Sequence, residues 1–166
     1  MWVYFVAALI PIVIGFIYYH EAALGKTWMR LNGFTPESLA GGNMAVTLGV
    51  SYVLGLLLTY ALWQLCIHQT GLFGMMAMVD GFGVEGSDVM VDYQAMMAKY
   101  GERHRSFGHG ALHGGFVGGL CIAVPVIAIN ALFERRGWRY IGVHAGYWIV
   151  TLAIMGGLLG QFAPNP

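Results

Sequence analysis

Two histidines four residues apart are the clearest chemical feature of this chain. His109 and His113 stand in the sequence His-Gly-Ala-Leu-His. Side chains at i and i+4 share one face of an α-helix, so both rings can offer a nitrogen to a single metal ion. No glutamate separates them, so this is not the zinc-protease motif. With His68 or His104 as a third ligand, the pattern predicts a transition metal or haem site.

Methionines cluster on the same side of the chain as these histidines. Their thioethers are soft ligands that suit Cu(I), although methionine also commonly fills gaps in packed regions. The six residues are Met75, Met76, Met78, Met90, Met96 and Met97. The alternative to a metal site is therefore a pair of hydrogen-bonded histidines surrounded by packing methionines.

Four apolar stretches must position these side chains. The chain is 58% hydrophobic and 10% charged, and each stretch approaches or exceeds the roughly 20 residues with which a helix crosses a bilayer. The stretches are residues 2–19, 44–67, 108–133 and 140–162. They predict an all-α membrane protein of one domain, 1–166, with four transmembrane helices. The long second loop, 68–107, is expected to carry a short amphipathic helix.

Glycines recur every four residues in the third and fourth stretches. Such spacing lets helix backbones approach closely, so we expect a glycine-packed bundle of the glycine-zipper type. The series are Gly110, Gly114 and Gly118; Gly115 and Gly119; Gly142 and Gly146; and Gly156 and Gly160. One series should pack the third stretch on the fourth, which leaves a second glycine face free for a homo-oligomer or a partner membrane protein.

Polar residues inside the stretches form two predicted groups. Asn130 and His144, with Asn43 as a further candidate, should lie at one end of the bundle. The histidines at 68, 109 and 113 should lie at the other end, together with Gln64 and Gln161. Intramembrane polar groups are costly and are often functional. A proton or small-solute relay through His113 and His144 is a second hypothesis.

The distribution of cations predicts the orientation. Five of the eight lie in the first and third loops, at Lys26, Arg30, Arg135, Arg136 and Arg139. Cytoplasmic loops carry the excess of Lys and Arg. Loops one and three should therefore be cytoplasmic, with both termini and the second loop outside.

Charge and cysteines exclude other classes of protein. The net charge is zero, with no basic patch that would bind nucleic acid. Cys66 and Cys121 fall at different depths, so we expect no disulfide. No serine or threonine has a partner that suggests a catalytic triad, so the sequence supports no enzyme.

Two segments carry a family resemblance. One is Gly25-Lys-Thr-Trp-Met-Arg-Leu-Asn-Gly-Phe34, and the other is His144-Ala-Gly-Tyr-Trp148 followed by Ile154-Met-Gly-Gly157. With them the chain resembles domain of unknown function 1761, a family of small bacterial four-helix membrane proteins. The resemblance implies an integral protein of a bacterial inner membrane and no catalytic residues. The second loop looks like a departure from shorter members.

Three hypotheses for function thus remain. The sequence favours a non-catalytic bundle that associates with itself or with another membrane protein, because the glycine faces are extensive and no reaction motif is present. Transport of a small solute or proton by an oligomer is the first alternative. An outward-facing metal or haem site at His109 and His113 is the second.

Overall fold

The structure, a computed structural model of residues 1–166, is entirely helical. The all-α prediction is confirmed. In chain order the helices are α1 (Trp2–Tyr18), α2 (Gly25–Asn32), α3 (Pro36–Ala40), α4 (Met44–Cys66), α5 (His68–Met76), α6 (Asp88–Tyr100), α7 (Phe107–Leu112), η1 (His113–Ala123), α8 (Val124–Phe133) and α9 (Trp138–Phe162).

Three helical rods are long and apolar enough to cross a membrane. They are α4, the continuous rod of α7, η1 and α8 over residues 107–133, and α9. Only 17% of the most apolar window of α4 is buried inside the protein, and 39% of that of α9. Apolar surface on this scale needs a hydrocarbon solvent, as an integral membrane protein has. Helix α1 is also apolar but has 17 residues.

Local sequence explains where several helices begin. Thr35 and Ser38 form a reciprocal capping box ahead of Pro36, and the side chains of Asn43 and Ser87 accept backbone N–H bonds at the starts of α4 and α6. These are the caps that the residue types predict, because a short polar side chain satisfies otherwise unpaired donors. Asn43 is therefore a helix cap, and it does not join His144.

The rod over residues 107–133 lies against α9 through glycines. A Cβ atom on Gly110 would meet the carbonyl oxygen of Gly156, and one on Gly114 would meet that of Leu152. Gly160 lies against the backbones of Ser106 and Gly110. The two backbones are thus in direct contact, which only residues without side chains permit.

The middle of this rod departs from the straight α-helix that the sequence predicts. Residues 113–123 form a π-helix, η1. Its hydrogen bonds close over one more residue than in an α-helix, so adjacent glycines lie closer to one face. Gly115 and Gly119 consequently contact Ala153 and Ile149 of α9. The expected free glycine face is absent, because both series of the rod pack within the chain.

The remaining glycines and the two cysteines differ in their contacts and burial. Gly118 contacts Leu62, Gly146 contacts the Tyr18 hydroxyl, and Gly142 has nothing near it. Both cysteines are free, as predicted. Cys66 is buried, but Cys121 is exposed on the surface of η1 rather than buried as expected.

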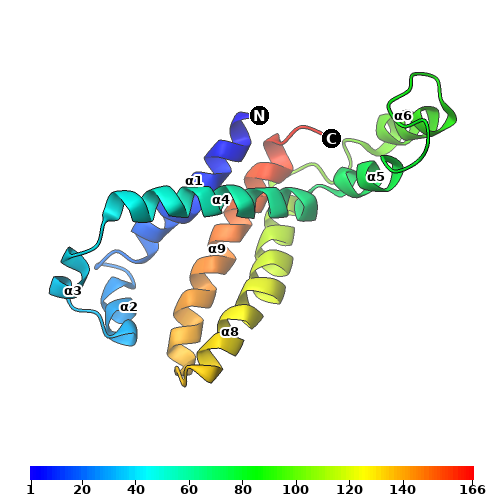
Figure 1. Ribbon diagram of the computed structural model, residues 1–166. Coiled ribbons are helices and arrows are strands. Elements are labelled where there is room, and N and C mark those ends of the chain that lie inside the picture. The colour runs from blue at the N-terminus through cyan, green and yellow to red at the C-terminus, as the bar shows by residue number, and fades with distance from the viewer.

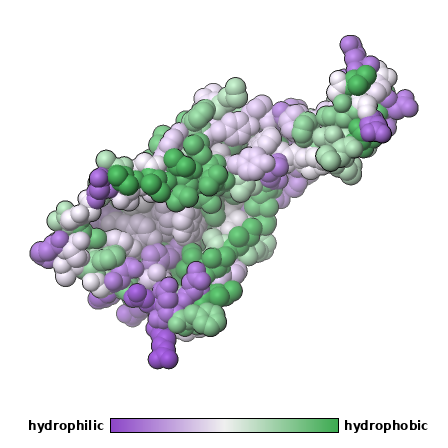
Figure 2. Space-filling view, viewed as in Figure 1, coloured by the Kyte–Doolittle hydropathy of each residue, from purple (hydrophilic) through white to green (hydrophobic).

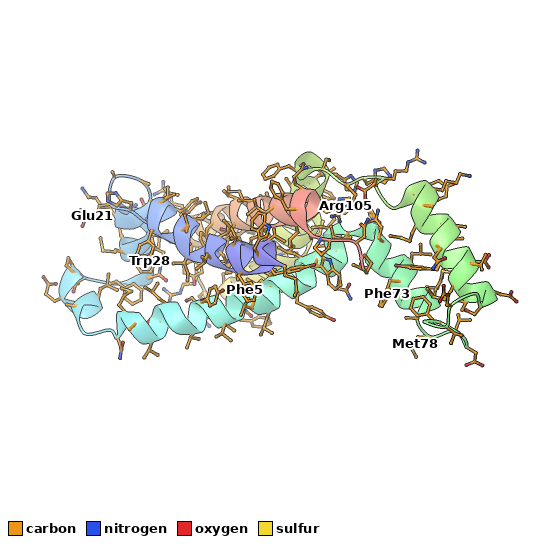
Figure 3. All side chains as sticks on the ribbon, turned by 90° about the horizontal axis from the view of Figure 1, so that it is seen from above. Phe5, Glu21, Trp28, Phe73, Met78 and Arg105 are labelled. Atoms are coloured by element: carbon orange, nitrogen blue, oxygen red, sulfur yellow. The ribbon has the colours of Figure 1, made fainter.

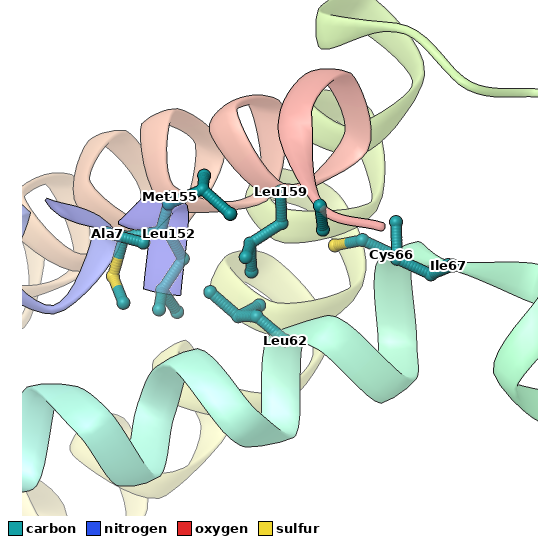
Figure 4. Close-up of a cluster of buried hydrophobic side chains, with 9 residues drawn as sticks. Ala7, Leu62, Cys66, Ile67, Leu152, Met155 and Leu159 are labelled. Atoms are coloured by element: carbon teal, nitrogen blue, oxygen red, sulfur yellow. The ribbon is translucent and has the colours of Figure 1, made fainter. Parts of the chain in front are cut away.

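A small apolar core joins α1, α4 and α9 (Figure 4). Leu62 and Cys66 of α4 meet Met155 and Leu159 of α9, with Ala7 of α1 beside them. Helix α4 crosses α1 obliquely (Figure 1) at Gly55, which lies against the backbone of Ala8. From this crossing the two helices diverge toward the start of α4.

The second loop is a helical arm. Ile67 has an extended backbone that ends α4, and α5 and α6 then project away from the bundle (Figure 1). The rings of Phe73, Phe82 and Tyr93 contact one another and form the arm's own core. The short helix that the sequence predicts in this loop is α6, and the arm that contains it lies beside the bundle (Figure 1).

Contacts at both ends of the bundle agree with the prediction that loops one and three lie at one end and the termini and the second loop at the other. Arg136 of the third loop donates to the carbonyl of Leu31 in α2, 3.3 Å away. At the other end, Trp2 lies 5.6 Å from Phe162 between ring centroids, and Tyr93 of the arm donates to the Pro166 carbonyl. The first and third loops thus share one end, and the termini and the arm share the other.

The glycine contact predicts a position-specific loss of stability. Gly156→Ala would place a methyl group on the Gly110 carbonyl and 3.0 Å from the Gly114 Cα. We expect a loss of about 1–3 kcal/mol, as overpacking usually costs, and a lower melting temperature by circular dichroism in detergent. Gly142→Ala is the control, since nothing lies within 4 Å of that site. Equal melting temperatures for both variants would contradict the contact.

Candidate metal centre

Three of the predicted ligands lie together at the end of the bundle where the arm begins. One potential ligand nitrogen from each of His68, His109 and His113 lies within 4.8 Å of the other two. The Nε2 atoms of His68 and His109 are 2.9 Å apart, and the ring centroids of His109 and His113 are 4.4 Å apart. Residues 41 positions apart in the chain thus converge on one point.

The tautomer of His113 follows from its hydrogen bond. Its Nδ1 lies 3.2 Å from the carbonyl oxygen of His109. A carbonyl only accepts, so Nδ1 must carry the proton, and Nε2 keeps its lone pair. Metal-binding histidines are usually oriented in this way, with one ring nitrogen donating to a backbone carbonyl.

The C-terminal end of α9 fixes α7, which carries His109 and leads directly into His113 at the start of η1. The Ser106 hydroxyl accepts from the backbone N–H of His109, and the Gln161 side chain accepts from that of Phe107 at 3.1 Å. The Arg105 guanidinium donates to the Ala163 carbonyl. Gln161, a predicted intramembrane polar residue, therefore caps α7 and makes no contact with a histidine ring.

A buried glutamine holds the arm in place beside His68. The side-chain nitrogen of Gln69 is 2.7 Å from the carbonyl oxygen of Gly101, 3.1 Å from that of Arg103 and 3.4 Å from that of Tyr100. This bridge ties the start of α5 to the end of α6. The sequence did not predict this bridge, because all its acceptors are backbone carbonyls, which every residue has. Gln64, one of the predicted intramembrane polar residues, is exposed.

His104 lies next to the three histidines. Its backbone is left-handed, with φ of 64°, and its ring stacks on that of His109 with centroids 4.7 Å apart. Its ring is 5.8 Å from that of His68. His104 therefore covers the site and is not one of the three converging donors.

Two of the predicted methionines border the site. Met96 and Met97 line a cavity of about 230 Å³ together with His68, His104 and Arg103. Met75, Met76, Met78 and Met90 do not line it, and Figure 3 shows Met78 in the arm, apart from Arg105. A thioether next to an imidazole suits a soft ion, whereas the Arg103 cation opposes one.

The surroundings of His68 favour its neutral form. Partial burial lowers the pKa of His68 from its ordinary value, and the neighbouring His113 and His104 lower that pKa further. The neutral imidazole, which is the form that binds metals, is thereby favoured at neutral pH.

The geometry fits a single ion better than a haem. Two axial histidines must hold their nitrogens about 4 Å apart, twice a metal–nitrogen bond of about 2 Å, with the porphyrin between them. The 2.9 Å between the Nε2 atoms of His68 and His109 leaves no room for such a plane.

The second predicted polar group lies at the opposite end of the rod. Asn130 and His144 line a cavity of about 170 Å³ with Glu134 and Tyr140. The Tyr19 hydroxyl is 3.4 Å from Nδ1 of His144, while Nε2 of His144 is buried without a partner. Asn130 and His144 therefore line the same cavity, and no hydrogen bond joins them.

Comparison with known proteins identifies a family. The model of a family described as "Protein of unknown function (DUF1761)" matches residues 2–160, so the chain belongs to this family. The match confirms the resemblance and runs through the second loop as well. No curated protein and no solved structure matches the chain.

The Gln69 bridge predicts how firmly the arm is held. Gln69→Leu leaves the carbonyls of Tyr100, Gly101 and Arg103 without their donor, and each such loss costs about 1–3 kcal/mol. We expect faster amide hydrogen exchange over residues 100–106, measured by mass spectrometry. Gln94→Leu, at an exposed position of α6, is the control. Unchanged exchange in the first variant would show that other contacts hold the arm.

Proposed function

We propose that this member of the DUF1761 family is an integral membrane protein that binds one transition metal ion at His68, His109 and His113. The convergence of three ligand nitrogens within 4.8 Å carries the proposal. His109 on α7 and His113 at the start of η1 lie on the rod that is fixed against α9, and His68 begins the arm. Binding would therefore join the arm to the bundle.

The donor set indicates the class of ion. Imidazole suits Zn²⁺, copper and nickel, and sites of three protein ligands leave a coordination position open. No cysteine or carboxylate belongs to the cluster. Met96 and Met97 lie across the neighbouring cavity, so copper is the ion for which a further soft ligand is closest.

The membrane arrangement that we propose has four spans. Helix α1 has the minimum length for a span, about 17 residues, and lies between Trp2 and Tyr19, aromatic residues of the kind found at membrane interfaces. The cations of the first and third loops favour a cytoplasmic position for that end. The termini, the arm and the metal centre would then face outward from a bacterial inner membrane.

Self-association and transport stay predictions. A free glycine face was expected to serve self-association, but both glycine series of the rod contact other parts of the chain. For a relay, His113 and His144 lie near opposite ends of their helices, and no described chain of polar groups joins them. Neither function has a specific observation in its favour.

The direct test is metal binding by the purified protein. Protein stripped of metal in mild detergent is titrated with Zn²⁺ and, under reducing conditions, with Cu(I), and native mass spectrometry counts the ions. We expect one ion per chain. His109→Ala and His113→Ala should each weaken binding at least about 100-fold, as the loss of a ligand or its close support does.

The control is His20→Ala, because His20 is the histidine at the end of α1, away from the centre. Binding that survives loss of both His109 and His113, or binding weaker in the His20 variant, would refute the site. Failure to bind either ion would refute the function.

Proton competition predicts the pH dependence. His68 has a lowered pKa in the folded protein, so its neutral form persists to lower pH than in a free histidine. The stability it contributes is present above the unfolded pKa of about 6.5 and is lost as pH falls through the folded value. Metal affinity should be constant above pH 7 and fall at least about tenfold per unit below pH 6, because ligands must lose protons. Isothermal titration measures this; a pH-independent affinity would exclude imidazole ligands.

A further inference from the structure

A large cavity lies between α1 and α4, away from His68, His109 and His113. The two helices cross at Gly55 and then diverge, and the cleft between them has a volume of about 740 Å³. Tyr147 and Trp148 of α9 form its floor, and Trp28 of α2 lines it as well. The hollow is visible below α4 in Figure 2. Its size is that of a small-molecule site, which is typically about 300–1,000 Å³.

The interior of this cleft favours an apolar occupant, because most of its lining is hydrophobic and three of its hydroxyl groups already have partners. The Tyr147 hydroxyl donates to the Pro11 carbonyl at 2.7 Å, and the Thr47 hydroxyl donates to the Asn43 carbonyl at 3.1 Å. The Tyr19 hydroxyl pairs with His144. Ten of the 17 lining residues are hydrophobic.

The cleft opens toward the side of the bundle that lipid would cover. Its lining includes Phe16 of α1 and Met44 and Leu54 of α4, which are 59%, 60% and 53% exposed. These are large apolar side chains on helices that need a hydrocarbon solvent. An occupant would therefore enter sideways from the bilayer, and bilayer lipid is the molecule present there.

The rim at the end of α1 carries a negative charge. Glu21 is the only carboxylate of the lining, which includes no Lys or Arg, and Glu21 forms no ion pair. The Nδ1 atom of His20 accepts the backbone N–H of Ala22, so that nitrogen carries no proton. Figure 3 shows Glu21 and Trp28 at the same end of the molecule.

Two aromatic rings share the cleft lining with this carboxylate. Tyr19 and Trp28 both line the cleft and lie 5.5 Å apart between centroids. Aromatic faces attract ammonium groups, and a carboxylate pairs with them. Charge and ring chemistry together favour a cationic amine at the rim above an apolar chain.

We propose that the cleft binds a bilayer lipid with an ethanolamine-type head, its acyl chain between α1 and α4 and its ammonium group at Glu21. This site is separate from the metal centre and does not depend on it. The ammonium group distinguishes this lipid from anionic lipids with the same chains.

The test compares two lipids with identical acyl chains. Protein delipidated in dodecyl maltoside is titrated with phosphatidylethanolamine or phosphatidylglycerol, and native mass spectrometry counts the bound lipid. We expect one tightly bound phosphatidylethanolamine, preferred about fivefold or more, as a partly exposed ion pair with a cation–π contact provides. Glu21→Gln should bring the ratio close to one.

Glu37→Gln is the matched control, because Glu37 is an exposed carboxylate of α3 outside the lining. Ser51→Phe, which fills the cleft, should abolish binding of both lipids, and its melting temperature reports whether it folds. Dodecylamine should displace the lipid, whereas dodecyl phosphate should not. Equal binding of the two lipids by the wild type, an unchanged preference in Glu21→Gln, or displacement by dodecyl phosphate alone would each overturn the proposal.

Discussion

The glycine-lined contact between the backbones of two helices is the constraint on which the rest of this structure depends. Gly110 and Gly114 of the rod over residues 107–133 lie directly on Gly156 and Gly160 of α9. In a bilayer, helices gain little from burying apolar side chains, so close packing of small residues holds them together. The π-helical turn in η1 widens this contact, because it brings Gly115 and Gly119 onto α9 as well. Both glycine series of the rod are thereby in contact with other parts of the chain.

That contact also determines where the histidines lie. The end of α9 reaches the start of α7, where Gln161 and the carbonyl of Ala163 hold Phe107 and Arg105. His109 and His113 are thus carried on a fixed helix, while His68 comes from the arm that Gln69 ties to residues 100–103. The cleft at the other end has a different origin, the crossing of α1 and α4 at Gly55. The two proposed sites therefore rest on independent contacts and can be tested separately.

Much of the architecture was predictable because it depends on local or compositional properties. Apolar runs long enough to span a bilayer predict helices, and Thr35, Asn43 and Ser87 predict helix starts, since both effects involve residues close in sequence. The spacing of His109 and His113 on one helix face is equally local. Levels along an antiparallel pair follow from counting residues back to the turn, which is why Asn130 and His144 could be expected at the same level; both line one cavity. The family resemblance rested on such local segments, and the match over residues 2–160 confirms it.

The tertiary structure alone decided what lies beside these helices. A residue count gives depth but not rotation, so the sequence left open whether His68 would face His109 and which groups Gln64 and Gln161 would contact. Gln69 bonds to backbone carbonyls, which every residue has, so no pattern marks it. The π-helix changes the angle between neighbouring residues and thereby turned a predicted free glycine face inward. The cleft exists only because two helices cross and diverge. In each case the physical reason is the same: helix rotation and crossing are set by packing between segments far apart in the chain, and the local sequence does not encode them.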